Sequence, residues 1–265
     1  MEVITSAQNP KIKNLLLLQE KSKARREQGL FVVEGQRELA HCLQAGYTVK
    51  TVFVCPEIAG SEASEEVCPS SPAVPAIIEI PEQLYRKVAY RESTEGIIAE
   101  VAYKSLTLED LHLPQNPLIM VLESVEKPGN LGAVLRSADA AGADAVLICD
   151  PLTDLYNPNL IRASIGAVFT VPVVAAPSAQ VIPWLQERGI QILTAQLQDS
   201  SLYYDVDMKR GTALVMGTES TGLTDMWRNA ASAHIRIPML GRLDSLNVSV
   251  SAAILLFEAV RQRQG

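Results

Sequence analysis

The sequence has little of the side-chain chemistry that builds metal centres and histidine-based active sites. Its three histidines, His41, His112 and His234, fall in separate segments and form no cluster along the chain. The four cysteines stand singly, with no C-x-x-C pair. We therefore expect no bound metal, no disulfides, and a general base other than histidine. The cysteines are Cys42, Cys55, Cys68 and Cys149.

Long apolar runs are also missing. A membrane-spanning helix needs about 20 consecutive apolar residues, and the longest candidate, around 252–257, lies in an amphipathic stretch near the C-terminus. Residues 1–5 lack the basic and apolar pattern of a secretory signal. We therefore expect a cytoplasmic protein with no membrane partner. With 48% hydrophobic and 20% charged residues, the composition is that of a globular protein with one large domain or two smaller ones.

A surplus of positive charge, which nucleic-acid-binding proteins usually carry, is absent from the chain as a whole. The net charge is −7 and the pI is about 5.1, and these totals argue against a nucleic-acid partner. The charge is unevenly distributed, however, because the first thirty residues contain a basic cluster opposed by three glutamates. Taken alone, this cluster favours a solvated helix face over a phosphate-binding surface. Its residues are Lys11, Lys13, Lys21, Lys23, Arg25 and Arg26.

The N-terminal part of the chain predicts a small α/β unit. Asn9 and Pro10 are a typical N-cap and first-turn proline, so a helix is predicted over 9–28, ended by Gly29. The stretch 56–75 is rich in Pro, Ser and Glu and is predicted to be an exposed loop. The predicted strands are 31–33, 49–55 and 97–101, and a second helix, ending at Gly46, follows the first of them.

After residue 117, apolar strands alternate with helices. The sequence predicts a strand over 118–122, a helix over 131–141 and a strand over 145–149, and the alternation continues towards the C-terminus. Continuous apolar strands of this kind belong to a mostly parallel sheet with helices on both faces. The predicted fold class is therefore α/β. The predicted divisions are a small α/β domain over 1–105, a linker over 106–116 and a second domain over 117–265.

Three segments of the second domain carry the pattern of a ligand site. They are Asn130 to Arg136, Val215 to Leu223, and the pair 237–239 and 245–251. In two of them an apolar strand runs into a small-residue turn and then a helix. Such turns present backbone N–H and C=O groups to a ligand at the strand ends. The pattern predicts a binding site at one edge of the sheet.

Taken singly, each segment also has a purely structural interpretation. Asn130 fits a helix N-cap, with Arg136 on the helix surface less than two turns further along. The run 217–222 lacks the Gly-Lys-Ser/Thr of a P-loop and the G-x-G-x-x-G of a dinucleotide turn, so neither a nucleoside triphosphate nor NAD is predicted. Ser245 is well placed to N-cap the final helix.

The order and spacing of the three segments resemble the SpoU, or TrmH-like, family of S-adenosylmethionine-dependent RNA ribose 2′-O-methyltransferases. The resemblance implies methyl transfer to a ribose 2′-hydroxyl, a trefoil knot near the C-terminus, and a homodimer with active sites at the subunit interface. Residues 6–10 and 31–35 resemble the L30e-like substrate-binding domain of the longer members. That likeness implies a structured RNA substrate, with ribosomal RNA favoured over transfer RNA.

The resemblance also implies roles for individual residues. Arg136, supported by Asn130, is implied to activate the ribose hydroxyl, either by stabilising the developing alkoxide or within a proton relay. Arg162 is a secondary candidate for a phosphate contact, since a charge at a helix end explains it equally well. The implied catalytic set is Asn130, Arg136, Glu219, Ser245 and Asn247; the cofactor-binding set is Gly217, Ile237, Met239 and Leu246; and the RNA-binding set is Lys11, Lys13, Lys23, Arg25, Arg26 and Arg162.

Alternatives stay open at this point. A transfer-RNA methyltransferase and a noncatalytic RNA-binding or assembly protein that retains the fold both fit, although the joint presence of the catalytic set disfavours the second. Knotted enzymes that modify bases lack the arginine at the position of Arg136, and dinucleotide-dependent enzymes need a glycine fingerprint that is missing here. Residues 127–129 are Lys-Pro-Gly where many relatives have Asp-Pro before the asparagine, so the target sites of those relatives are not carried over.

Overall fold

The computed structural model describes residues 2–60, 75–90, 95–218 and 221–264, and the chain forms two compact units. The first unit comprises Met1–Lys104 with Asp154–Thr170, and the second comprises Ser105–Thr153 with Val171–Gly265. The boundary after Lys104 lies beside the predicted end of the first domain. The segment 154–170, which the sequence analysis assigns to the second domain, groups with the first unit. The predicted domain limits themselves stay a prediction.

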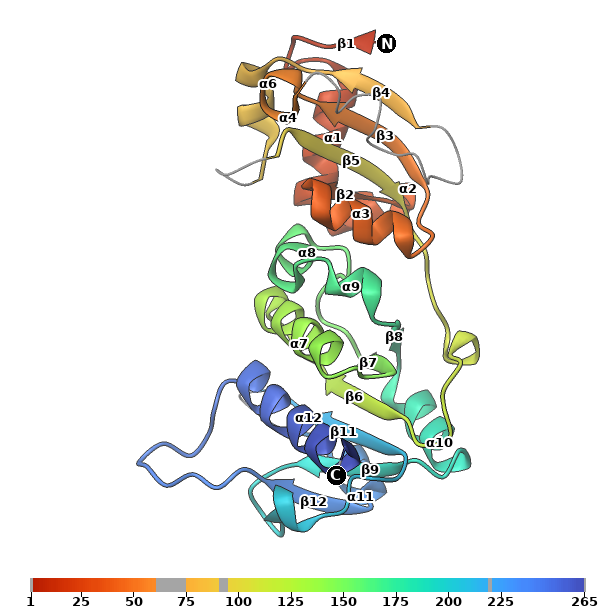
Figure 1. The fold of residues 1–265 in the computed structure, drawn as a ribbon, viewed down its shortest axis with the longest axis vertical. Helices are drawn as coiled ribbons and strands as arrows, with labels where there is room; N and C mark the ends of the chain where they lie inside the picture. The colour runs from red at the N-terminus through yellow and green to blue at the C-terminus, as the bar shows by residue number, and fades with distance from the viewer. Residues whose placement is uncertain (1, 61–74, 91–94, 219–220, 265) are drawn as a thin grey trace. The chain divides into compact units, whose positions relative to one another are not determined.

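A mixed sheet forms the centre of the first unit (Figure 1). Among the described residues its strands follow the order β1-β4-β3-β5-β2. Strand β4 is parallel to β1 and β3, whereas β5 is antiparallel to β2 and β3. The expected small α/β unit is therefore confirmed. Its strands are β1 (Glu2–Val3), β2 (Leu30–Glu34), β3 (Val49–Val54), β4 (Ala76–Glu79) and β5 (Ile97–Ala102).

The helix predicted over 9–28 is two helices, α1 (Pro10–Glu20) and α2 (Ser22–Gln28). The chain breaks at Lys21, whose backbone is extended at φ −110° and ψ 110°. The Arg25 side chain stabilises this break, because it turns back from α2 and donates hydrogen bonds to carbonyls at the end of α1. Its acceptors are the carbonyl oxygens of Leu18 at 2.6 Å and Gln19 at 3.1 Å.

The other helices of the first unit pack against its sheet or against one another. Asn9 caps α1 as expected, accepting from the backbone N–H of Lys11 over 2.9 Å, and Gly29 ends α2 in the left-handed conformation. The start of the predicted loop 56–75 is a short helix, and residues 61–74 of it lie outside the described part of the chain. The remaining helices are α3 (Gln36–Gln44), α4 (Pro56–Ala59), α6 (Glu82–Val88), α8 (Pro158–Ser164) and α9 (Ala167–Thr170).

An ion pair and aromatic stacking attach segment 154–170 to the rest of the first unit. Arg25 is 1% exposed, and its Nε donates to Asp154 Oδ2 over 2.6 Å. The ring of Tyr156 stacks on the ring of Phe31 in β2, with centroids 4.1 Å apart. The ring of Phe169 also stacks on Phe31, with centroids 6.0 Å apart. A buried charge without its partner is strongly destabilising. The position of the segment therefore depends on the pair of Arg25 and Asp154 and on the ring of Phe31.

The second unit is built on a parallel sheet. Its described strands follow the order β10-β12-β9-β11-β6-β7-β8, and each adjacent pair is parallel. The central strands β6, β7 and β11 are buried along their whole length, because helices cover both faces. The mostly parallel sheet is thus confirmed. Its strands are β6 (Leu118–Glu123), β7 (Ala145–Cys149), β8 (Val173–Ala176), β9 (Gln191–Ala195), β10 (Ser201–Leu202), β11 (Thr212–Met216) and β12 (Ala233–Arg236).

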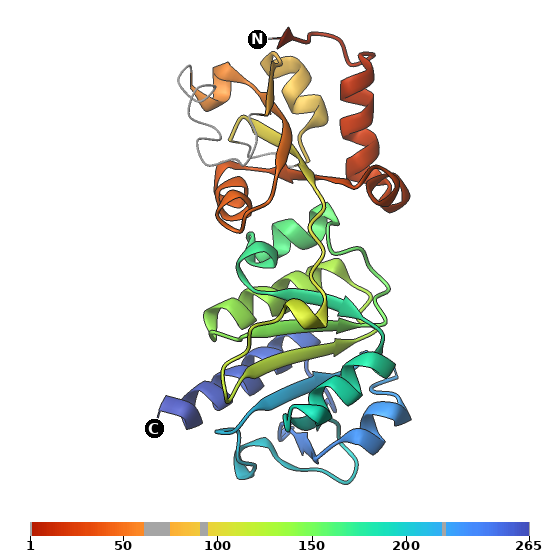
Figure 2. The ribbon, with the colours of Figure 1, turned by 90° about the vertical axis from the view of Figure 1, so that its right-hand side faces the viewer.

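Helices lie on both faces of the parallel sheet (Figure 2). On one face, α10 (Ser178–Glu187) and α11 (Asp225–Ala230) contribute to the buried core with the central strands. On the other face, α7 (Pro128–Ala140) and α12 (Val248–Gln264) pack against each other and against the sheet. In the part of the chain that is described, no helix is long and apolar enough to cross a membrane. The trefoil knot stays a prediction.

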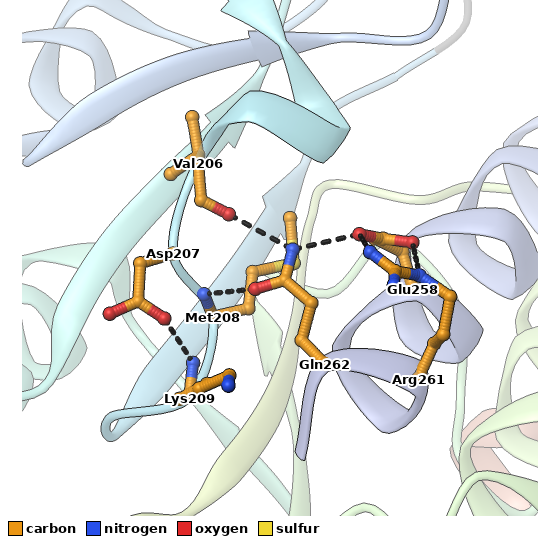
Figure 3. Close-up of polar contacts among 7 residues, drawn as sticks. All are labelled: Val206, Asp207, Met208, Lys209, Glu258, Arg261 and Gln262. Atoms are coloured by element: carbon orange, nitrogen blue, oxygen red, sulfur yellow. Dashed lines mark hydrogen bonds and ion pairs between the residues drawn. The ribbon is translucent and has the colours of Figure 1, made fainter. Parts of the chain in front are cut away.

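Side chains near the C-terminal end of α12 attach this helix to the loop before β11 (Figure 3). Gln262 accepts from the Met208 backbone N–H over 2.8 Å and donates to the Val206 carbonyl over 3.1 Å. It also donates over 2.7 Å to Glu258, whose pKa is lowered by hydrogen bonds from Arg261. These contacts set the position of the whole helix and so of its first residue, which lines the site described below. Arg263 adds bonds to the carbonyls of Asn116, Pro117, Met208 and Arg210.

Replacing Arg25 with Met should lower the free energy of unfolding by about 3 kcal/mol, because Asp154 would lose its ionic partner. The side chain of Asp154 is only 10% exposed, so water would compensate the loss poorly. Arg26→Met is the matched control, since Arg26 is exposed and such changes usually stay within about 0.5 kcal/mol. Urea denaturation followed by circular dichroism measures both variants. Equal effects would contradict the role assigned to the buried pair.

Candidate functional site

A cavity of about 390 Å³ lies in the second unit at the carboxyl ends of β9, β11 and β12. The ends of these strands contribute Ala195, Met216 and Arg236 to its lining. This edge of a parallel sheet is the usual place for ligands in α/β proteins. The sequence predicts a site at this edge of the sheet, and Ser245 lines the cavity together with the whole predicted cofactor-binding set. That set is Gly217, Ile237, Met239 and Leu246.

Gly217 lines the cavity with its backbone and has no room for a side chain. A Cβ atom at this position would lie 2.3 Å from both the carbonyl carbon and the carbonyl oxygen of Gly222. The close approach arises from a tight turn in which the Gly222 N–H donates to the Thr218 carbonyl over 3.1 Å. Gly222 itself has φ +69°, which favours glycine. The turn therefore needs glycine at both ends.

Buried polar networks hold the chain that follows this turn. The carboxylate of Glu123, at the end of β6, accepts from the backbone N–H of Thr224 over 2.9 Å and from its hydroxyl over 2.7 Å. Trp227 is fully buried, and its Nε1 donates to Ser178 Oγ over 2.9 Å. That hydroxyl donates in turn to Asp150 Oδ2 over 2.5 Å. Helix α11 therefore has a fixed position beside the cavity.

A second cavity, of about 130 Å³, adjoins the first. Gly217, Thr218 and Val248 line both cavities, so the two share a common wall. The rest of the smaller cavity comes from the loop before α7 and from its first turn, including Lys127 and Asn130. Two cavities that adjoin in this way provide separate places for two reactants that meet at Gly217. Asn130 is the member of the expected catalytic set that lines the smaller cavity.

The side chain of Asn247 connects this smaller cavity with α12. Its Nδ2 donates to Asn130 Oδ1 over 3.2 Å, and its Oδ1 accepts from the Ser249 N–H over 3.0 Å. The second bond is a helix N-cap, so the expectation that Ser245 caps the final helix is wrong. The reason is that α12 begins at Val248, two residues later than that cap requires. Ser245 Oγ donates to Asp244 instead, over 3.2 Å.

Helix α7 begins earlier than the sequence indicates. It was expected over 131–141, with Asn130 as its N-cap, but its first residue is Pro128. Proline favours the first turn because its fixed φ suits a helix and its missing N–H costs nothing there. Asn130 is therefore inside the first turn, which directs its side chain to Asn247 and leaves the capping position to Lys127.

Arg136 lies on α7, is exposed, and is not among the described residues that line either cavity. The structure therefore brings together Asn130, Ser245 and Asn247 near Gly217 but does not add Arg136 to them within one chain. Glu219, the remaining member of the expected catalytic set, lies outside the described residues.

The expected RNA-binding residues belong to the first unit, and all but one are exposed. Arg25 is the exception: its guanidinium is buried against Asp154, so the expectation that it contacts RNA is wrong. Lys11 pairs with Glu2, and Lys23 lies 3.7 Å from Glu27. Lys13, Arg26 and Arg162 are exposed, the last of them on α8.

Several cavity residues were missed by the sequence analysis. Thr218 and Thr221 lie within a recognised segment, and their small polar side chains were a usable signal. Arg228 and Asp244 lie outside the segments, and only the fold brings them to the cavity. Two of the thiols are unsuited to nucleophilic roles, because burial raises the pKa of Cys149 to about 12 and that of Cys55 to about 11.

Replacing Asn247 with Ala should lower the free energy of unfolding by about 1 kcal/mol, the usual cost of a lost N-cap. Ser245→Ala is the matched control and should cost less than about 0.5 kcal/mol, because its hydroxyl caps no helix. Thermal unfolding followed by circular dichroism distinguishes them. A larger loss of stability for Ser245→Ala than for Asn247→Ala would indicate that Ser245, as expected from the sequence, is the N-cap residue of α12.

Comparisons with known proteins identify relatives of both parts of the chain. Residues 117–257 match the SpoU rRNA Methylase family, and residues 9–99 match the MRM3-like substrate binding domain. A 23S rRNA (guanosine(2553)-2′-O)-methyltransferase of Bacillus subtilis is 28% identical over 97% of this chain and 98% of its own length. A 23S rRNA (uridine(2479)-2′-O)-methyltransferase of Streptomyces viridochromogenes is 30% identical over 89% and 84%, respectively.

Solved structures have the same fold over almost the whole chain. An RNA 2′-O ribose methyltransferase superposes with a TM-score of 0.85 at 40% identity, covering 99% of this chain and 100% of its own. An rRNA methyltransferase from Sinorhizobium meliloti with bound AdoMet superposes with a TM-score of 0.89 at 30% identity, covering 98% and 97%. Since the family match spans residues 117–257, which include both cavities, this chain belongs to the SpoU rRNA methylase family.

Proposed function

We propose that the protein transfers a methyl group from S-adenosylmethionine to a ribose 2′-hydroxyl of 23S ribosomal RNA. The observation that carries the proposal is the pair of adjoining cavities with a shared wall at Gly217, Thr218 and Val248. The relatives that match most of the chain act on 23S rRNA, but one modifies guanosine and another uridine. Their names therefore support the reaction and the RNA class and leave the target nucleotide open.

The larger cavity fits the cofactor. Its volume of about 390 Å³ is within the range of about 300–1,000 Å³ usual for small-molecule sites. Main-chain groups at Gly217, Ile237 and Leu246 are the proposed hydrogen-bonding partners, and apolar side chains such as Met239 exclude water. When bound, S-adenosylmethionine supplies an electrophilic methyl group. Gly217 lines both cavities with its backbone, and any side chain there would meet Gly222.

The smaller cavity is the proposed place for the target ribose. Asn130 and Lys127 line it, and Asn247 holds Asn130 through a hydrogen bond of 3.2 Å. Amide and ammonium groups donate hydrogen bonds to hydroxyl and phosphate oxygens. These residues orient the ribose, and the charged Arg136 stabilises the negative charge that develops on the 2′-oxygen. The new O–C bond replaces the S–C bond to the methyl group, S-adenosylhomocysteine leaves, and the hydroxyl proton passes to solvent. An arginine is a poor proton acceptor, so its proposed role is electrostatic.

A second copy of the chain is the proposed source of Arg136 in each site. Apolar side chains are exposed on the outer face of α12 and on the loop before it, which Figure 1 shows as a long connection from β12. Exposed apolar surface of this kind commonly marks an interface. The residues are Leu240, 97% exposed, Leu243, 76% exposed, Val250 and Phe257. A symmetric dimer across this face fits the exposed position of Arg136 on the neighbouring helix α7.

The first unit is the proposed RNA-binding part. Its match to a substrate binding domain supports this role, and exposed cations such as Lys13, Arg26 and Arg162 are suited to phosphate contacts. The acidic total charge makes RNA affinity depend on where these cations lie rather than on their sum. A ribosomal RNA substrate also fits the cytoplasmic location expected from the sequence.

Arg136→Ala should reduce methyl transfer by about 10²–10³-fold, the usual effect of removing one donor that stabilises a developing negative charge. Binding of S-adenosylmethionine should stay unchanged, because the proposed contact of Arg136 is with the ribose in the smaller cavity and the larger cavity has its own lining. The measurement is transfer of labelled methyl groups to undermodified 23S rRNA, followed by nucleoside analysis, with cofactor affinity measured by calorimetry. Full turnover of the variant would remove Arg136 from the mechanism.

Mixed dimers test the shared site. Arg136→Ala and Gly217→Val should each be inactive, the second because a side chain at 217 collides with Gly222. Random mixing should restore about one quarter of wild-type activity, because half the dimers are mixed and each has one complete site. If Arg136 served its own subunit, no mixed dimer would contain a complete site and activity would stay at the level of the separate variants.

A further inference from the structure

Arg228 lies in α11, outside the segments that mark the family, and lines the larger cavity. Its Nε is buried, and within the described part of the chain no acceptor lies within hydrogen-bonding distance of it. The nearest carboxylate is Asp225 Oδ1, 3.6 Å from Nη1, and the Asp225 side chain is 88% exposed. That pair is too long for a hydrogen bond and is weakened by solvent. The guanidinium is therefore available to a ligand.

The surroundings hold Arg228 in place. The preceding residue, Trp227, is fully buried and bonds to Ser178, and the N-cap residue Thr224 is bonded to Glu123. Helix α11 is therefore held in place, and the Arg228 side chain, 41% exposed, stays beside the cavity. The exposed part of the guanidinium is what a ligand can reach. An anionic ligand group in the cavity would accept hydrogen bonds from the accessible Nη groups of Arg228.

The charges around the larger cavity indicate which anionic ligand group would bind Arg228. Arg228 and Arg236 contribute positive charge to the lining, and Asp244 contributes negative charge. Of the two arginines, Arg236 already donates to Ser200 Oγ over 3.4 Å. S-adenosylmethionine has one anionic group, the carboxylate of its methionine part. A guanidinium matches a carboxylate geometrically and electrostatically.

The position of Arg228 favours the carboxylate of the cofactor over an RNA phosphate as its ligand. Its Nη2 lies 3.8 Å from where a Cβ atom of Gly222 would be, so it is next to the turn that contacts Gly217. It lines the larger cavity, whereas the smaller one, proposed for the ribose, is formed by other residues. We propose that Arg228 binds the methionine carboxylate of S-adenosylmethionine and thereby selects ligands that carry the amino-acid end. This proposal rests on the proposed function of the cavity.

A comparison of ligands with and without that end tests the proposal. Calorimetry on the full chain measures the affinity of the wild type and of Arg228→Met for S-adenosylhomocysteine and for 5′-methylthioadenosine, which lacks the amino-acid end. The variant should lose about ten- to a hundredfold in affinity for S-adenosylhomocysteine, the usual effect of losing a charge-assisted hydrogen bond. Its affinity for 5′-methylthioadenosine should change less than about twofold. Arg228→Lys should give an intermediate loss, because lysine keeps the charge but not the planar fork.

Arg236→Met is the matched control, since Arg236 lines the same cavity. It should affect the two ligands to the same extent. Equal losses for both ligands with Arg228→Met would overturn the proposal, since they would indicate a change in cavity shape. It would equally be overturned by unchanged affinity for both ligands, by a loss in RNA affinity alone, or by a selective loss in Arg236→Met instead. If the wild type bound neither S-adenosylmethionine nor S-adenosylhomocysteine, the proposed function itself would fail.

Discussion

The side-chain amide of Asn247 forms hydrogen bonds with two helices, α7 and α12, and the arrangement of the site depends on these bonds. Its oxygen accepts from the first turn of α12, so its nitrogen is the end that faces α7 and donates to Asn130. This choice also fixes which atom of Asn130 accepts. Both helices line the smaller cavity through residues next to this bond, Asn130 and Val248. One amide thus sets the width of that cavity and the orientation of its polar wall.

Close contacts also determine the shape of the site at Gly217. The turn closes so tightly that a side chain at position 217 would have no room beside Gly222, and Gly217 is part of the wall that the two cavities share. Such a wall is useful only if the elements on each side stay in place. Glu123 holds the start of α11 on one side, and the bonds of Gln262 and Arg263 hold the far end of α12 on the other. The site is therefore supported by buried polar contacts some distance from the ligands.

Much of this site followed from the sequence because strand ends converge. Gly217 and Ile237 come directly after parallel strands, so they had to meet at one edge of the sheet, and the resemblance to a family supplied their roles. The errors have a different origin. The break at Lys21, the burial of Arg25 and the cap at Asn247 each depend on a partner far away in the chain or on the end point of a helix. Arg25 meets Asp154, 129 residues later, and no local pattern around Arg25 contains that information.

Segment 154–170 shows what this long-range pairing means for experiments on the substrate-binding part. A shortened chain that begins at Ser105 would keep the segment but lose the rest of its compact unit. Tyr156 and Phe169 would then lose the ring of Phe31, and Asp154 would lose Arg25. Apolar surface of this kind exposed in solution favours aggregation. A weaker RNA interaction of the shortened chain would therefore not separate lost RNA contacts from damage to the β7–β8 connection. Substitutions of the exposed cations Lys13, Arg26 and Arg162 avoid that ambiguity, because these side chains lie outside the buried contacts that hold the segment.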